Sequence, residues 1–133
     1  MNRPTTQSHA ATPWGHADQQ TGYAAGITFF STPSHGGFYV SPTTRNSMPE
    51  PYRSHPPFCG KAGWYEEDCD WAVVALSFPQ FFTADELEAA RRTWGYILER
   101  KAESINPKTG HTFKDDIGRR GDGLTPTDAD SGL

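Results

Sequence analysis

Gly26-Ile27-Thr28-Phe29-Phe30-Ser31-Thr32 is the stretch that decides the fold, and Phe38-Tyr39-Val40-Ser41 follows it after five residues. Both segments are rich in β-branched and aromatic residues, which favour strands. The intervening Pro33-Ser34-His35-Gly36-Gly37 has the composition of a turn. We therefore predict an antiparallel hairpin with its turn at Pro33–Gly37. A weaker alternation over residues 16–23 predicts another strand before it.

A first helix is expected after the hairpin. Trp64-Tyr65-Glu66-Glu67-Asp68 would open it, because acidic residues suit the positive end of the helix dipole. The next apolar positions are spaced i, i+3, i+4 and i+7, as on one helix face: Cys69, Ala72, Val73 and Leu76. Pro79 would end this helix, which we expect to be largely buried.

A second helix begins at a capping box, in which Thr83 is the N-cap and Glu86 is the N3 residue. It runs to about Glu103, with Leu98 on its inner stripe. The expected fold is α+β, a three- or four-stranded antiparallel meander packed against two helices. Its expected core includes Phe29, Phe38, Val40, Val73, Leu76, Leu87 and Trp94.

The polar ends of the chain bound the domain. Residues 1–11 and 114–133 have almost no large apolar side chains, so we expect disordered tails flanking a single domain over residues 12–113. Trimming the tails would then leave stability unchanged. Within the domain, the proline-rich residues 42–63 lack periodicity and are expected to be a functional or mobile connection.

Composition excludes several classes of protein. The formal net charge is -4 and the basic residues form no stripe, which argues against a nucleic-acid partner. There is no apolar run of membrane-spanning length and no secretory signal pattern, so a cytoplasmic location is expected. No phosphate loop or dinucleotide fingerprint is present, and we expect no cofactor.

His35 is the first candidate for chemistry. Gly36 and Gly37 leave its imidazole uncovered by neighbouring side chains, which suits an acid/base or ligand-contacting histidine. The alternative is that the two glycines only turn the hairpin and that His35 bonds a local backbone group.

Glu66-Glu67-Asp68-Cys69-Asp70 is the second candidate, and it lies between Trp64 and Trp71. On a helix, Asp68 would share a flank with alanines and would be partly buried. Because a buried carboxylate needs a partner, we expect Asp68 to pair with His35. The alternative is that these acids cap a helix and keep the surface soluble.

Cys59 and Cys69 are expected to be free thiols, since nothing in the sequence indicates export. The spacing of these cysteines with His35 and His55 lacks the paired short ligand loops of structural zinc sites, so no metal is expected. A Cys–His nucleophilic pair with His35 stays open as an alternative.

Three segments resemble an uncharacterised bacterial domain family of proteobacterial plasmid, integrated-element and phage proteins. They are Thr12-Pro13-Trp14-Gly15, the stretch from Gly26 through Phe38, and Gly63-Trp64 through Trp71, and the resemblance covers about residues 12–90. The family carries no known activity. The resemblance implies a mobile-element setting and places both candidate clusters in one domain.

Two functions are compatible with these features. The first is a non-catalytic binding or inhibitor protein of a mobile element that acts on a host protein. Its expected binding residues are His35, Gly36, Gly37, Trp64, Tyr65, Glu66, Glu67, Asp70 and Trp71. The second is a small hydrolase-like enzyme that uses His35 as base and Asp68 as its orienting partner.

Overall fold

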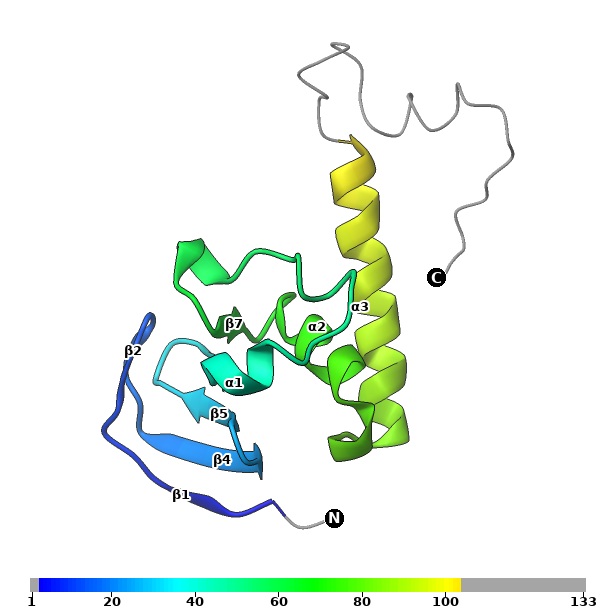
Figure 1. Cartoon of the computed structure of the whole chain (residues 1–133). Coiled ribbons are helices and arrows are strands. Elements are labelled where there is room, and N and C mark those ends of the chain that lie inside the picture. The colour runs from blue at the N-terminus through cyan, green and yellow to red at the C-terminus, as the bar shows by residue number, and fades with distance from the viewer. Residues whose placement is uncertain (1–2, 104–133) are drawn as a thin grey trace, which may run out of the picture. The chain divides into compact units, whose positions relative to one another are not determined.

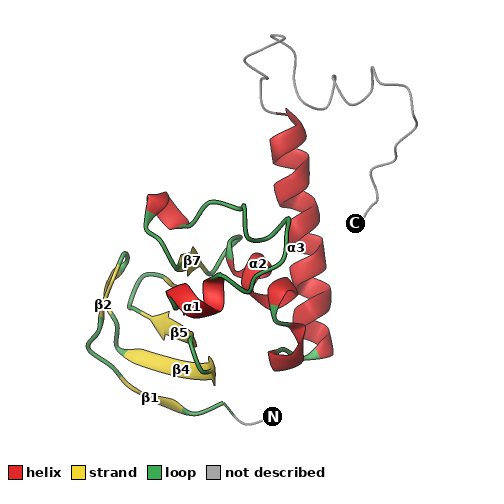
Figure 2. Cartoon of the chain, viewed as in Figure 1, coloured by secondary structure: helices red, strands yellow, loops and turns green. Residues whose placement is uncertain are grey.

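The computed structural model describes residues 3–103, and its centre is a five-stranded antiparallel sheet (Figures 1 and 2). In the order in which they pair, its strands are β1 (Thr5–Gln7), β4 (Gln19–Ala24), β5 (Ile27–Ser31), β6 (Gly36–Val40) and β7 (Trp64–Glu66). Two further short strands, β2 (Ala11–Thr12) and β3 (Gly15–His16), form a separate hairpin. Together with the helices described next, this sheet confirms the expected α+β class.

The helices follow the hairpin in the chain. They are α1 (Pro42–Arg45), α2 (Trp71–Ser77) and α3 (Ala84–Glu103), with single 3-10 turns η1 (Phe58–Gly60) and η2 (Pro79–Phe81). The chain divides after Trp94 into two units, residues 1–94 and 95–133. Of the second unit, the structure describes the C-terminal part of α3.

The predicted hairpin is present, but its turn is shorter than expected. β5 and β6 pair from Ile27 opposite Val40 to Ser31 opposite Gly36. The turn is closed at Thr32, whose backbone N–H and Oγ1 both donate to the carbonyl of His35, at 2.8 and 2.7 Å. The prediction that Gly36 and Gly37 turn the chain is wrong, because both residues already pair in β6.

Close packing explains the two glycines of β6. A Cβ on Gly36 would lie 2.8 Å from the carbonyl oxygen of Phe30. A Cβ on Gly37 would overlap the Trp14 ring and the Tyr65 carbonyl oxygen. These positions need glycine because other groups occupy the space of a side chain, without any unusual backbone angle.

The prediction of a helix that begins at Trp64 is wrong. Residues 64–66 form β7, which pairs with the free side of β6, with Tyr39 opposite Trp64. An unpaired β6 would leave its backbone polar groups without partners, and aromatic residues favour strands. The acidic residues after β7 form a turn, and α2 begins only at Trp71.

The core lies between the sheet and α2. Phe38, Val40 and Tyr65 point to this face and are at most 3% exposed. The central residues of α2 are fully buried, as expected for a largely buried helix: Ala72, Val73, Val74 and Ala75. The expected core residues Phe29, Leu76 and Leu87 are only half-buried.

The N-terminal segment differs from the expected tail. β1 pairs with β4 from Thr5 opposite Thr21 to Gln7 opposite Gln19. Arg3 forms an ion pair with Glu86 at 2.6 Å. Because β1 is an exposed edge strand of polar residues, its order comes from backbone pairing and not from apolar burial.

The capping box of α3 is confirmed. The Thr83 N–H donates to Glu86 Oε1 at 2.8 Å, and the Glu86 N–H donates to Thr83 Oγ1 at 3.1 Å. Further along α3, Leu98 is 44% exposed, so its placement on an inner stripe is wrong. The expected C-terminal tail, residues 114–133, lies outside the described residues.

The proline-rich connection is more ordered than its sequence suggests. It contains α1 and η1, and Met48 and His55 within it are 1% and 8% exposed. Buried side chains of this kind attach the connection to the domain, although it has no regular hydrophobic period.

Candidate functional site

His35 and Asp68 do not form the expected pair. Both side chains are exposed, and among residues 3–103 no hydrogen bond or ion pair joins them. Asp68 is exposed because it lies in the turn before α2 and not on the flank of a helix. The catalytic arrangement of His35 and Asp68 is therefore not formed in this structure.

The two predicted clusters nevertheless meet through their backbones. β6 and β7 pair with Gly37 opposite Glu66, and the Glu67 N–H donates to the Gly36 carbonyl at 2.9 Å. The pairing of β6 with β7 thus brings the glycines beside the first acidic residues, while His35 stays in the turn.

Glu66 organises the turn between β7 and α2. Its carboxylate accepts hydrogen bonds from the N–H groups of Asp68 at 2.9 Å, Cys69 at 2.5 Å and Asp70 at 3.2 Å. Three backbone donors on one carboxylate give Glu66 a structural role of the kind that a capping residue has.

Asp70 pairs with a histidine, but the histidine is His55. His55 Nε2 lies 2.8 Å from Asp70 Oδ1, and the two side chains are 8% and 18% exposed. The His55 ring also lies edge-on to Trp94, with centroids 6.0 Å apart. This pair ties the proline-rich connection to the start of α2, which explains why His55 is buried.

Five half-buried aromatic residues gather on the face of the sheet opposite the core, and we call them the outer aromatic cluster: Trp14, Phe30, Tyr39, Phe58 and Trp64. Trp64 is at its centre, with ring centroids 4.9 Å from Tyr39, 5.6 Å from Phe30 and 5.7 Å from Trp14. Phe58 extends it, at 5.3 Å from Trp14.

Strand alternation explains why these rings share a face. Tyr65 points to the core, so its neighbour Trp64 points outward beside Tyr39. Trp14 arrives from the β2–β3 hairpin and lies over Gly37, where there is no side chain to block it. Gly37 is therefore required at this position, because a side chain there would displace Trp14 from the cluster.

The core-facing side of the sheet has a cavity of about 200 Å³ lined by aromatic and acidic side chains. Its lining residues are Tyr23, Phe29, Phe38, Glu67, Trp71, Phe82 and Glu86. Four of the rings contact one another, with centroids between 4.9 and 5.8 Å apart.

Arg3 is not one of the lining residues, but it contacts three of them. Its guanidinium donates to both carboxylate oxygens of Glu86, at 2.9 and 2.6 Å, and to the Phe81 carbonyl at 3.0 Å. It also lies 4.0 Å from the centre of the Tyr23 ring and 5.6 Å from that of Phe82. Glu86 and the rings of Tyr23 and Phe82 thus hold the Arg3 guanidinium by charge and by ring faces together.

This contact perturbs the titration of its members. The hydrogen bonds from Arg3 lower the pKa of Glu86 to about 2. The same hydrogen bond raises the pKa of Arg3 above its ordinary value. Burial raises the pKa of Tyr23, and the nearby Arg3 charge partly opposes that rise.

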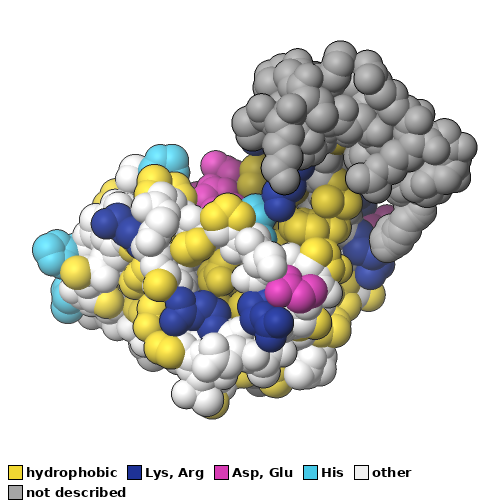
Figure 3. Space-filling model, turned by 45° about the horizontal axis from the view of Figure 1, so that its top comes forward, with side chains coloured by type: hydrophobic (Ala, Val, Ile, Leu, Met, Phe, Trp, Pro, Cys, Tyr) yellow, Lys and Arg dark blue, Asp and Glu magenta, His cyan; other side chains and the backbone are white. Residues whose placement is uncertain are grey.

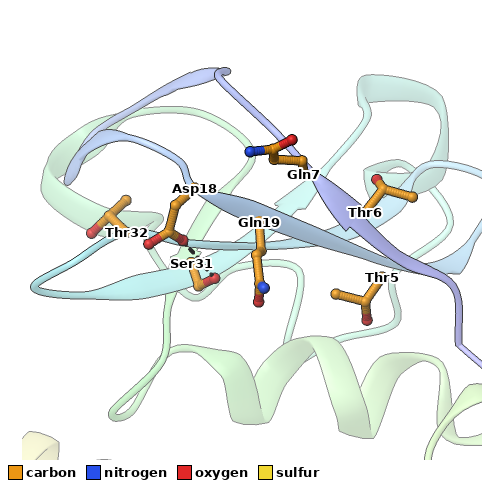
Figure 4. Close-up of a pocket in the computed structure, with 7 residues that line it drawn as sticks. All are labelled: Thr5, Thr6, Gln7, Asp18, Gln19, Ser31 and Thr32. Carbon is orange, nitrogen blue, oxygen red and sulfur yellow. Dashed lines mark hydrogen bonds between the residues drawn. The ribbon is translucent and has the colours of Figure 1, made fainter.

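A second hollow, larger and more open, lies along β1 and β4 (Figure 4). Its lining is polar: Thr5, Thr6, Gln7, Asp18, Gln19, Ser31 and Thr32. Asp18, the one charged residue of this lining, accepts a hydrogen bond from Ser31 Oγ at 3.3 Å. Thr5 and Thr32 also form hydroxyl hydrogen bonds, with Thr21 and with the His35 carbonyl.

Charged side chains and cysteines elsewhere add three observations. The face shown in Figure 3 has Lys and Arg side chains between hydrophobic ones, without a continuous basic stripe. In residues 3–103 no group of three or more His, Cys, Asp and Glu side chains is arranged to hold a metal ion. Cys59 and Cys69 form no disulfide with each other.

Within the same part of the chain, every helix is too short or too polar to cross a bilayer.

These features define a small α+β domain with an aromatic outer face and an inner cavity lined by aromatic rings and two carboxylates. The chain belongs to the family described as a domain of unknown function, DUF7007, whose model matches residues 7–115. No curated protein and no solved structure matches it.

Several of these residues could not be found from the sequence. Arg3 lies in a polar segment, and its partner Glu86 is far away in the chain. Tyr23 is an isolated aromatic residue, Phe82 follows Phe81 in a short connection before the α3 capping box, and His55 lies among prolines. Trp64, Glu67 and Trp71 were indicated by the acidic and tryptophan-rich pattern around them.

Proposed function

We propose that this domain is a non-catalytic binding protein that acts on another protein through the outer aromatic cluster. The observation that carries the proposal is the convergence of five half-buried rings from separate segments on one sheet face. Tryptophan and tyrosine are the residues most enriched among the energetic centres of protein interfaces.

The chemistry around the cluster favours a protein partner over a nucleic acid. Aromatic rings also stack on single-stranded bases, but such sites combine them with a basic groove. Here the chain carries a net charge of -4, and the rings of the cluster pack tilted or edge-on against one another. An apolar patch on a protein fits this face better.

The identity of the partner as a host protein, and the setting of the domain in a bacterial mobile element, are parts of the same proposal. Both rest on the resemblance of the segments around Trp14, His35 and Trp64. A hydrolytic role for His35 with Asp68 is the weaker proposal, because the two exposed side chains share no hydrogen bond in this structure.

Site-specific photo-crosslinking tests the proposal. A photoreactive phenylalanine analogue replaces Phe58 in the cluster or, as the control, Tyr96, which is 62% exposed on α3. In cells that encode the protein, we expect position 58 to crosslink to a discrete protein and position 96 not to. The same crosslinks from both positions, or none from position 58, would contradict the proposal.

A further inference from the structure

The cavity between Glu67 and Glu86 has the chemistry of a cation site. Five of its seven lining residues are aromatic, and the other two are carboxylates. Ring faces attract cations, and the attraction grows when water is excluded from the site. The cavity lies on the core side of the sheet and is therefore separate from the outer aromatic cluster.

Arg3 supplies a precedent for the ligand. Its guanidinium already lies on the Tyr23 ring and pairs with Glu86, and so two of the cavity residues bind an organic cation within this chain. Arg3 compensates the charge of Glu86 but leaves the cavity itself open, because it is not among the lining residues.

Glu67 is the carboxylate that remains available. Its side chain is exposed, and within residues 3–103 it forms no ion pair. It lies close to Gly36, where a Cβ would be 3.3 Å from Oε1. The two carboxylates and Arg3 together leave one uncompensated negative charge at the cavity.

We propose that this cavity binds an organic cation, a guanidinium or alkylammonium group, through Glu67 and the faces of Trp71 and Phe29. A volume of about 200 Å³ accommodates such a head group. The group would come from a free small cation or from an arginine or lysine side chain of a polypeptide.

The indole N–H resonance of Trp71, assigned with Trp71→Phe, reports binding by NMR. Methylguanidinium and tetramethylammonium are the probes, and methylurea is the neutral analogue of the first. We expect saturable shifts with the cations, with dissociation constants on the order of a few millimolar, and none with methylurea. Equal shifts with methylurea, or no saturable shift with either cation, would overturn the proposal.

Two variants test whether the Glu67 carboxylate contributes to cation binding. Glu67→Gln should weaken methylguanidinium binding about fivefold, the size expected for a partly exposed charge contact. Asp68→Asn removes the next carboxylate in the chain, which does not line the cavity, and should change the constant less than about twofold. Equal constants for both variants would contradict the assignment to Glu67.

A capped Gly-Arg-Gly peptide distinguishes the source of the cation. Binding at least as tight as that of methylguanidinium assigns the cavity to a polypeptide side chain. Binding of the free cations alone assigns it to a small molecule. Either result supports a cation site, whereas binding by none of these probes overturns it. Crosslinking at position 58, which tests the proposed function of the outer aromatic cluster, is unaffected by the outcome.

Discussion

Replacing Arg3 by methionine keeps an apolar stem over Tyr23 and removes the charge that holds Glu86. The lowering of the Glu86 pKa from 4.5 to about 2 would correspond to about 3 kcal/mol at 1.36 kcal/mol per pH unit. The Glu86 side chain is 32% exposed, so solvent screening reduces this by about half. Hydrogen bonds from Thr83 also lower the pKa and survive the change.

Adding about 0.5–1 kcal/mol for the cation–π contact with Tyr23, we expect Arg3→Met to lower the free energy of unfolding by about 2 kcal/mol at pH 7. Urea denaturation measures this difference directly. The matched control is Arg92→Met, which removes an exposed ion pair with Glu88 on α3 and should cost less than about 0.5 kcal/mol.

The pH dependence has a definite sign. Because the folded-state pKa of Glu86 is lowered, its contribution is fully present above the unfolded pKa of 4.5. It is lost as the pH falls towards about 2. The stability difference between wild type and Arg3→Met should therefore shrink over this window. A difference below about 0.5 kcal/mol at pH 7, or one that does not change with pH, would refute the reasoning.

Three other changes to the chain, two at single residues and one a truncation, test the same packing. Gly37→Ala should destabilise the domain by more than about 2 kcal/mol in thermal unfolding and displace the Trp14 ring. Its control is Gly95→Ala, where a Cβ meets open space, and this change should stabilise α3 by about 0.5–1 kcal/mol. Equal effects of the two changes would contradict the close approach at β6. His55→Ala should cost about 2–3 kcal/mol, because it leaves Asp70 without its partner and opens space beside Trp94, and urea unfolding unchanged from wild type would exclude the anchoring role. Removing residues 1–10 should destabilise the domain by at least as much as Arg3→Met, since β1 is lost as well, and unchanged stability would restore the expectation of a tail.

The parts of the fold that local sequence determines were predictable. The β5–β6 hairpin follows from its β-branched and aromatic residues, and the start of α3 follows from Thr83 and Glu86. Both signals act between residues close in the chain, where propensity and capping chemistry decide the conformation.

The parts that depend on distant partners were not predictable. Trp64–Glu66 precedes acidic residues as a helix start would, but β6 needs a neighbouring strand and β7 supplies it. β1 has only exposed polar residues, so it has no hydrophobic signal, and its order comes from pairing with β4. The candidate pair His35–Asp68 depended on the incorrect helix and failed with it.

The measurement that tests the central claim most directly is a calorimetric titration of the crosslinked partner, once purified, against three forms of the protein. These are the wild type, Phe58→Ser in the outer aromatic cluster, and Tyr96→Ser on α3, which removes an exposed ring outside the cluster. We predict that Phe58→Ser weakens binding at least about tenfold, as loss of an interface anchor does, and that Tyr96→Ser changes it less than about twofold. Equal affinities for all three forms would contradict the claim that this domain binds its partner through the aromatic face of its sheet.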